Sequence, residues 1–292
     1  MEGRILKGVG SFYTVLAGEE AHICKARGRF RKEGLAPVPG DWVSFEAGGS
    51  TEGYLLEIHP RRNLLTRPAV ANVDKLFIVM AASYPQMDLF LCDKLLFQCR
   101  ALSIAPVLLC NKCDGGADAE AFGALAAQYG PAGYTVLATS AKTGEGLEAV
   151  AAQMEGCVSC FAGQSAVGKS SLLNALVPGL GLEVGGLSRK TERGKHTTRH
   201  AELFPAFGGA VADTPGFSLL DMREMEPWDL SKFYPEMARA RESCRFPECL
   251  HLTEPDCAVK PLLETGGLHP LRYQRYQAFL DELKEKRKHR YD

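Results

Sequence analysis

The sequence lacks the features of a membrane or exported protein. Its 292 residues contain no apolar run of about 18 residues, the length that a transmembrane helix needs, and no signal peptide is recognised. The formal net charge is only −1, which excludes a global electrostatic attraction to RNA. Together with ten cysteines, these absences indicate a protein of the reducing cytosol without a membrane partner.

Internal repeats and low-complexity tracts are also absent. With 46% hydrophobic residues, the chain can bury an α/β core of about 160 residues and still carry two small modules. Domain boundaries are predicted near Arg67-Pro68, where proline interrupts an extended segment, and between Asp221 and Pro227, where the sequence turns polar. The chain thus divides into residues 1–68, 69–222 and 223–292, and a monomer is the default expectation.

A phosphate-binding motif is present at Gly163-Gln164-Ser165-Ala166-Val167-Gly168-Lys169-Ser170, with Ser171 next in the chain. Strand character precedes it and helical character follows it, which is the setting of a P-loop. Its two glycines let backbone N–H groups point at phosphate oxygens, beside the positive end of a helix. Lys169 is expected to reach the β- and γ-phosphates and Ser170 to bind Mg²⁺. An ordinary strand-to-helix turn is the alternative.

Two later segments fit the magnesium and γ-phosphate side of such a site. Asp213-Thr214-Pro215-Gly216 follows an apolar run, which places Asp213 at a strand end near the Mg²⁺ and lets the Gly216 N–H approach the γ-phosphate. The Gly-, Lys- and Arg-rich stretch 181–200 suits a loop ordered by phosphate and metal. Within it Thr198, in preference to Thr197, is the expected Mg²⁺ ligand, unless the pair merely opens the next strand.

A base-recognition motif is present at Asn111-Lys112-Cys113-Asp114, after an apolar run. Asp114 can accept two hydrogen bonds from the guanine edge, whereas adenine lacks that donor pair. Asn111 is expected to fix the orientation of the base, and the stem of Lys112 to lie along its ring. The turn Thr139-Ser140-Ala141-Lys142 follows the next predicted strand, and the Ala141 N–H is expected to meet guanine O6. For Asn111-Lys112-Cys113-Asp114, an ordinary surface turn is the alternative.

These motifs occur in an unusual order, because the base motif precedes the P-loop. Strands are predicted at 73–80, 105–110, 134–138 and 157–162, and helices at 88–102, 117–129 and 145–154. The helix 145–154 runs directly into the P-loop strand, where an unpermuted domain has its two termini. Since domain termini often lie close together, such a circular permutation is physically easy. The permutation also connects the segment after Asp213 directly to the C-terminal domain.

The C-terminal region contains Cys244, Cys249, His251 and Cys257 within fourteen residues. Four nitrogen and sulfur ligands at this spacing fit a closed, structural Zn²⁺ site. Metal binding would replace the core that so small a segment lacks. Unliganded or disulfide-bonded cysteines are the alternative. Two other Cys-x-x-Cys pairs, at 110/113 and 157/160, have no histidine partner and are interpreted as core residues.

The N-terminal region reads as five short strands, at 3–8, 11–17, 20–28, 40–46 and 53–59, which fits a small barrel such as an OB-fold. Cations alternate along the third strand and its extension: Lys25, Arg27, Arg29 and Arg31. With Phe12, Tyr13 and Phe30 as stacking surfaces, this pattern resembles an RNA-binding groove. A solvated charged face is the alternative. The final helix, predicted from about His269, carries Arg272, Arg275 and a basic last turn. It is interpreted either as an RNA-binding surface or as a solvated charged face.

The whole combination resembles the ribosome small subunit-dependent GTPase A family. An all-β OB-fold barrel, a central α/β circularly permuted P-loop GTPase domain and a Cys-x4-Cys-x-His-x5-Cys segment occur here in the family's order. The resemblance implies a bacterial cytoplasmic GTPase that binds the small (30S) ribosomal subunit late in maturation and contacts rRNA through its flanking domains. It further implies slow hydrolysis alone and stimulation by the subunit.

The catalytic assignment is less direct. Phe217 stands where many small GTPases place a glutamine that orients water, so His196 is the candidate for that role. Lys169 is the second expected catalytic residue, through its contacts to the phosphates. A solvent-exposed loop histidine is the alternative for His196. Two other functions stay open: an RNA-binding scaffold in which GTP is only a conformational ligand, and a P-loop kinase. The guanine-reading motif disfavours the kinase.

Overall fold

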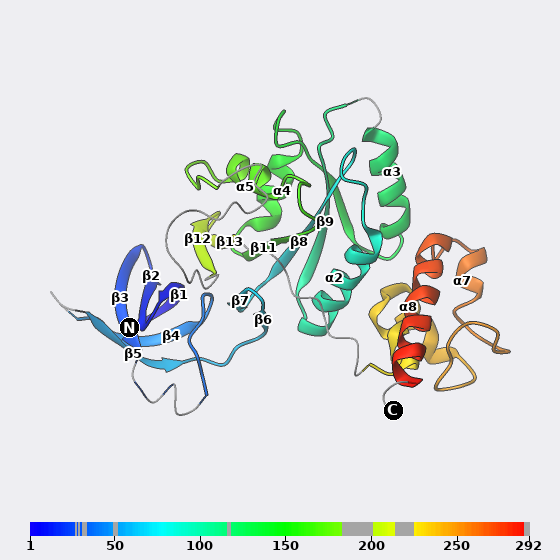
Figure 1. Cartoon of the computed structure of the whole chain (residues 1–292), viewed down its shortest axis with the longest axis horizontal. Helices are drawn as coiled ribbons and strands as arrows, with labels where there is room; N and C mark the ends of the chain where they lie inside the picture. The colour runs from blue at the N-terminus through cyan, green and yellow to red at the C-terminus, as the bar shows by residue number, and fades with distance from the viewer. Residues whose placement is uncertain are drawn as a thin grey trace.

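The structure is a computed structural model that describes residues 1–26, 28, 30, 34–48, 52–115, 118–182, 201–213 and 225–288. Figure 1 shows three parts in chain order: a β-barrel, a central sheet covered by helices, and a C-terminal group of helices and loops. Within these described residues, no helix has both the length and the apolar character needed to cross a membrane.

The N-terminal part is a closed five-stranded barrel. Its strands are β1 (Glu2–Val9), β2 (Phe12–Ala17), β3 (Glu20–Ala26), β4 (Trp42–Glu46) and β5 (Gly53–Ile58). They pair in the order β1-β2-β3-β5-β4, and β4 closes on β1. Alternate residues such as Val15, Val43 and Phe45 fill the interior with no exposed surface. The predicted OB-fold is confirmed.

Phe30 belongs to this interior. Its side chain is only 3% exposed and packs in the barrel cluster with Ile5 and Leu55. The prediction that Phe30 offers a stacking surface is therefore wrong, because a small barrel uses its large rings to exclude water from its core. Phe12 remains partly exposed, at 38%.

A short hairpin not predicted from the sequence connects the barrel to the central sheet. It comprises β6 (Leu64–Thr66) and β7 (Ala69–Ala71), with a cis peptide bond at Arg67-Pro68. Asn72, directly after it, donates from Nδ2 to the Gly40 carbonyl at 3.0 Å. A Cβ at Gly40 would lie 2.0 Å from the Ala71 carbonyl oxygen, so glycine permits this close approach.

The central sheet has the order β10-β9-β8-β11-β13-β12. Its strands are β8 (Lys75–Ala81), β9 (Ala105–Asn111), β10 (Thr135–Ala138), β11 (Val158–Ala162), β12 (Glu202–Ala206) and β13 (Gly209–Asp213). Neighbouring strands from β10 to β13 run parallel, and β12 is antiparallel to β13. The four strands predicted before the P-loop are confirmed, with no end shifted by more than two residues.

Helices cover both faces of this sheet, as Figure 1 shows. They are α2 (Leu89–Leu102), α3 (Asp118–Tyr129), α4 (Leu147–Met154) and α5 (Lys169–Leu176). Along β8, Ile78 and Met80 pack in one cluster with residues of α2 and α3. Phe77 and Val79 point the other way and pack with residues of α4 and α5. Strands buried on both faces explain why their sequences are almost continuously apolar.

The barrel and the central sheet are hydrogen-bonded to each other. Barrel strand β1 pairs with β12, where Lys7 lies opposite Glu202, so one sheet of 11 strands runs through both parts. The Lys7 ammonium lies 2.9 Å from a Glu202 carboxylate oxygen. The barrel is thus attached to β12, the strand that follows residues 181–200 in the chain.

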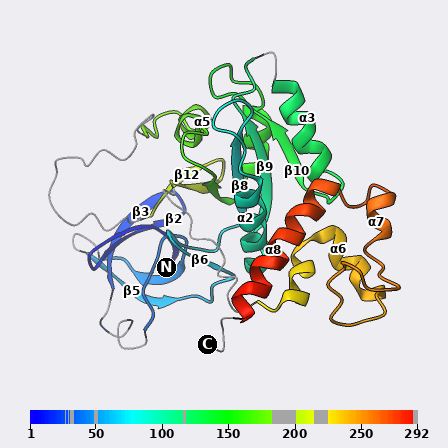
Figure 2. The ribbon, with the colours of Figure 1, turned by 45° about the vertical axis from the view of Figure 1, so that its right-hand side comes forward.

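The C-terminal part packs against α2. Its elements are η2 (Pro227–Phe233), α6 (Pro235–Ala240), η3 (Arg241–Ser243), α7 (Pro261–Glu264) and α8 (Pro270–Lys288). Figure 2 shows α8 running beside α2, and the ring centroids of Phe97 and Phe279 are 5.3 Å apart. The predicted final helix is confirmed by α8. However, Arg272 and Arg275 are buried, at 1% and 7% exposure, so they are part of neither a solvated face nor an RNA-binding one.

Candidate nucleotide-binding site and metal centre

The P-loop connects the carboxyl end of β11 to α5. Gly163 has φ 136° and Gly168 has φ 94°, both in the region that favours glycine. A Cβ at Gly163 would lie 2.1 Å from the Val79 carbonyl oxygen, and one at Gly168 would lie 2.6 Å from Asn111 Nδ2. Since α5 begins at Lys169, its N-terminal N–H groups face the loop, as an anion site requires.

Lys169 lies over this loop. Its Nζ donates to the Gly163 carbonyl at 2.9 Å and also to the Gln164 carbonyl. Ser170 and Ser171 follow in the first turn of α5 and are half-buried. The lysine and both hydroxyls therefore lie at the end of α5 where a bound phosphate would be placed.

The base motif lies against the P-loop, although more than 50 residues separate them in the chain. Asn111, 1% exposed at the end of β9, donates from Nδ2 to the Val167 carbonyl at 2.9 Å. Lys112 has φ 65° and donates from Nζ to the Ala166 carbonyl at 2.7 Å. The structure thus brings together the two motifs that the sequence predicts around one nucleotide.

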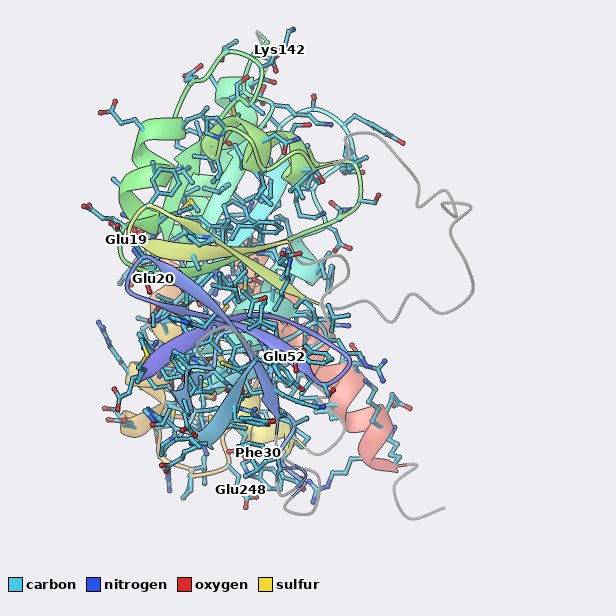
Figure 3. The ribbon with its side chains drawn as sticks, turned by 90° about the vertical axis from the view of Figure 1, so that its left-hand side faces the viewer. Glu19, Glu20, Phe30, Glu52, Lys142 and Glu248 are labelled. Carbon is cyan, nitrogen blue, oxygen red and sulfur yellow. The ribbon has the colours of Figure 1, made fainter. Side chains whose placement is uncertain are left out.

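The turn after β10 completes the base side of the site. The Cys113 N–H donates to the Thr139 carbonyl at 3.0 Å, which joins the base motif to this turn. The Ser140 hydroxyl accepts from the Lys142 and Thr143 N–H groups, and Ala141 lies between. Lys142 Nζ lies 3.0 Å from an Asp114 carboxylate oxygen, at the outer edge of the domain in Figure 3. The base motif and the turn 139–142 therefore lie side by side, as expected for the two segments that would contact a guanine base.

The structure describes some of the residues that are predicted to lie near the magnesium. Asp213 ends β13, beside β11, so the backbone places it at the same sheet edge as the P-loop. The side chain of Asp213 and the predicted residues His196, Thr198 and Gly216 lie outside the described residues. Ser170 is the predicted magnesium ligand whose surroundings are described.

The metal cluster is compact. The ligand atoms of Cys244, Cys249, His251 and Cys257 all lie within 4.8 Å of one another. His251 Nδ1 lies 3.6 Å from the Cys244 sulfur and 3.4 Å from the Cys257 sulfur. All ten cysteines are described and free, which excludes the disulfide alternative. Three sulfurs and one imidazole nitrogen form a donor set that fits tetrahedral Zn²⁺.

The surroundings of the cluster favour the ligand form of its histidine. Burial and the nearby Arg241 lower the pKa of His251 to about 4, so its imidazole is neutral at pH 7. The loop is braced from α8, where the Tyr273 hydroxyl donates to the His251 carbonyl at 2.6 Å. Glu254 accepts from the Leu250 and Leu252 N–H groups at 2.8 Å each. The sequence analysis missed Tyr273 and Glu254, because neither is a metal ligand.

On the barrel surface, the structure describes one of the four predicted cations. Lys25 is exposed on β3, while Arg27, Arg29 and Arg31 lie outside the described residues. Its neighbours across the strands are Phe12 on β2 and Tyr54 on β5. Lys25 Nζ lies 5.5 Å from the Phe12 ring centroid, and Tyr54 is 45% exposed. The sequence analysis missed Tyr54, whose outward position in the alternating segment 53–58 is the signal for it.

Comparison with known proteins agrees with this arrangement. The sequence model of the RsgA N-terminal domain matches residues 2–55, and that of the RsgA GTPase matches residues 58–223. The small ribosomal subunit biogenesis GTPase RsgA of Geobacillus kaustophilus is 44% identical over 292 residues, covering 99% of both chains. The protein of the same name from Bacillus anthracis is 44% identical over 292 residues, again covering 99% of both chains.

Two solved structures share the whole architecture. YloQ, described as a circularly permuted GTPase, superimposes with a TM-score of 0.82 at 38% identity, covering 98% of this chain and 95% of its own. YjeQ from Thermotoga maritima superimposes with a TM-score of 0.84 at 35% identity, covering 97% of this chain and 98% of its own. The strand order found here, with the base motif ahead of the P-loop, matches that description. This chain is therefore a circularly permuted GTPase that belongs to the RsgA GTPase family.

Proposed function

We propose that this protein hydrolyses GTP during late maturation of the small ribosomal subunit and binds the subunit and its rRNA in a GTP-dependent manner. The observation that carries the proposal is the hydrogen bonding of Asn111 and Lys112 to the P-loop carbonyls. This contact supports a single nucleotide site formed by the phosphate-binding loop and the base motif that contains Asp114. The small ribosomal subunit is proposed as the partner because the relatives are named small ribosomal subunit biogenesis GTPases.

The residues of this site have distinct proposed roles. Asp114 accepts from the guanine edge, Ala141 donates its N–H to O6, and Ser140 and Lys142 shape the base side of the site. The P-loop N–H groups and Lys169 hold the phosphates. Ser170, Thr198 and Asp213 would hold the magnesium, which would supply positive charge to stabilise the phosphate oxygens. Gly216 would contact the γ-phosphate, and His196 would orient the attacking water.

The flanking parts are proposed to dock on the subunit. In this division, residues 1–68 bind RNA, residues 69–222 bind and hydrolyse GTP, and residues 223–292 carry one structural Zn²⁺ on the four ligands of the cluster. We propose a monomer that works in the cytoplasm. Because the net charge is only −1, affinity for RNA must come from local patches such as the one around Lys25.

Co-sedimentation with purified small subunits tests the GTP dependence. More protein should sediment with subunits in the presence of a non-hydrolysable GTP analogue than with GDP, because only the analogue carries a γ-phosphate that can favour the binding-competent state. Equal sedimentation in both states would contradict the proposal. GTP-dependent binding without any hydrolysis would favour the scaffold alternative.

The barrel patch gives a second prediction. Replacing Lys25 with alanine should reduce the slope of log Kobs against log salt concentration for RNA binding by about 1, since one phosphate contact is lost. Tyr54→Ala should weaken binding by about 1–3 kcal/mol without changing that slope, because base stacking is not ionic. Lys7→Ala is the control, because Lys7 already pairs with Glu202. An unchanged slope in Lys25→Ala would remove Lys25 from the RNA-binding surface.

A further inference from the structure

Helix α2 is bound to the C-terminal domain by a buried ionic network. Asp93, in its second turn, is 1% exposed although it is a carboxylate. Its Oδ1 accepts from Arg272 Nη1 at 2.9 Å, and its Oδ2 accepts from Arg275 Nε at 2.6 Å. Both arginines come from α8. Two buried charge-assisted contacts therefore join α2 directly to α8.

The network extends to two more helices. Arg272 Nε donates to Glu236 of α6 at 2.6 Å, and Arg275 Nη1 donates to Gln128 of α3 at 3.0 Å. Two carboxylates thus balance two guanidinium groups. Burial opposes the charge of Arg272, but Asp93 and Glu236 raise its pKa well above the usual range. Because breaking one member would leave an uncompensated buried charge, α2, α6 and α8 are expected to move as one body.

The N-cap residue of the same helix is bound to the P-loop by a much weaker contact. Asp88 caps α2, since its side chain accepts from the Leu91 N–H at 2.8 Å. The Asp88 N–H in turn donates to Gln164 Oε1 at 3.2 Å, in an exposed position. Beside this contact lies a cleft of about 750 Å³, lined by residues 85–90 and Gln164 on one side and by Leu271, Gln274 and Arg275 on the other.

Gln164 is also a residue whose surroundings depend on phosphate binding. Its carbonyl accepts from Lys169 Nζ. A lysine that binds the β- and γ-phosphates directs its Nζ at phosphate oxygens, so phosphate binding exchanges the contact to this carbonyl for one to the ligand. Loss of the Lys169 contact would change the hydrogen bonding of the Gln164 carbonyl, while the Gln164 side chain is bonded to the N-cap residue of α2. A difference at the P-loop can thereby bias the position of α2.

We propose that Gln164 is a positioning residue that links phosphate binding at the P-loop to the C-terminal domain, with α2, α6 and α8 responding as one body. This inference rests on the proposed function, because it requires a nucleotide at the P-loop. It adds a second connection to the covalent one, in which the segment after Asp213 leads into the C-terminal domain. The second connection runs through the side chain of Gln164, the backbone N–H of Asp88 and the side chain of Asp93.

Hydrogen exchange of the full chain tests the link, measured with no nucleotide, saturating GDP and a saturating non-hydrolysable GTP analogue. In the wild type, amide exchange at the start of α2 and in α8 should change together between states, by roughly 2- to 10-fold, as expected for gaining or losing one hydrogen bond. Gln164→Leu keeps the side-chain size but removes the acceptor, so the α8 response should be lost. Gln274→Leu, on the opposite wall of the cleft, is the matched control and should keep the response.

A second variant tests the buried end of the link. In Asp93→Asn, exchange in α8 should be fast in every nucleotide state while the start of α2 still responds, because the helices no longer move together. Should Asp93→Asn fail to fold, Gln164→Leu decides alone, since it leaves the buried network intact. An α8 response that persists in Gln164→Leu, or is absent from a nucleotide-bound wild type, would overturn the inference. Failure of the wild type to bind any nucleotide would instead overturn the proposed function, and the inference with it.

Discussion

GTP turnover by this protein is expected to rise by roughly 10³- to 10⁵-fold when purified small ribosomal subunits are added, the factor that a missing transition-state group is worth in GTPases. The residue after Gly216 is Phe217, whose side chain cannot hydrogen-bond a water molecule. The isolated chain therefore lacks the usual water-positioning group at that position. We expect the subunit to supply or order the missing contact, and steady-state phosphate release with and without subunits measures it.

The same assay separates hydrolysis from scaffolding. Equal turnover with and without subunits, together with GTP-dependent co-sedimentation, would favour a scaffold in which GTP is only a conformational ligand. His196→Ala should abolish most of the stimulation while subunit binding is retained. If stimulated turnover is unchanged in His196→Ala, another group orients the water. Lys169→Ala is the control that should lose both nucleotide binding and turnover.

Removal of the metal is expected to unfold the segment around residues 244–268. Structural zinc sites bind with apparent free energies of about 10–16 kcal/mol in small peptides at pH 7, and in such segments this binding energy is folding energy. Hydrogen bonds of Tyr273 and Glu254 also brace this loop, but no disulfide joins the four ligand side chains, whose ligand atoms lie within 4.8 Å of one another. Elemental analysis should find one zinc per chain. A strong chelator should remove it with a loss of protection from hydrogen exchange confined to this segment and α8.

Two cysteine variants sharpen that experiment. Cys257→Ser should lose the zinc, whereas Cys160→Ala should keep it, because Cys160 is also a buried thiol but lies in β11 outside the cluster. Glu254→Gln should also keep the metal, since Glu254 braces the loop through the Leu250 and Leu252 N–H groups without belonging to the cluster. A wild-type chain purified without zinc and still protected at residues 244–268 would contradict the assignment.

The features that the sequence predicted correctly share a local cause. Close contacts require glycine at positions 163 and 168, and both glycines belong to the eight-residue P-loop motif. The strands before it are almost wholly apolar, because helices cover both faces of the sheet. The metal cluster also falls within fourteen residues. Each of these signals lies in a short window, so a single sequence contains it.

The features that the sequence did not reveal depend on contacts between distant segments. Arg272 and Arg275 look like solvated helix charges until Asp93, 179 residues from Arg272, is placed beside them. Phe30 looks like a stacking ring, but the closed barrel surrounds it. The hairpin of β6 and β7 has strands of only three residues, too short for a periodic pattern. The β1–β12 pairing likewise joins Lys7 to Glu202 across two domains.

The most direct test of the central claim is an equilibrium titration of the full chain with GTP, ATP and xanthosine triphosphate, each with magnesium. The wild type should bind GTP on the order of 10²- to 10⁴-fold more tightly than ATP, which is the factor for two hydrogen bonds to a carboxylate. In Asp114→Asn the preference should move to xanthosine triphosphate, because the amide donates where the carboxylate accepted. Equal affinity of the wild type for GTP and ATP would contradict the claim that the base motif and the P-loop bind one guanine nucleotide.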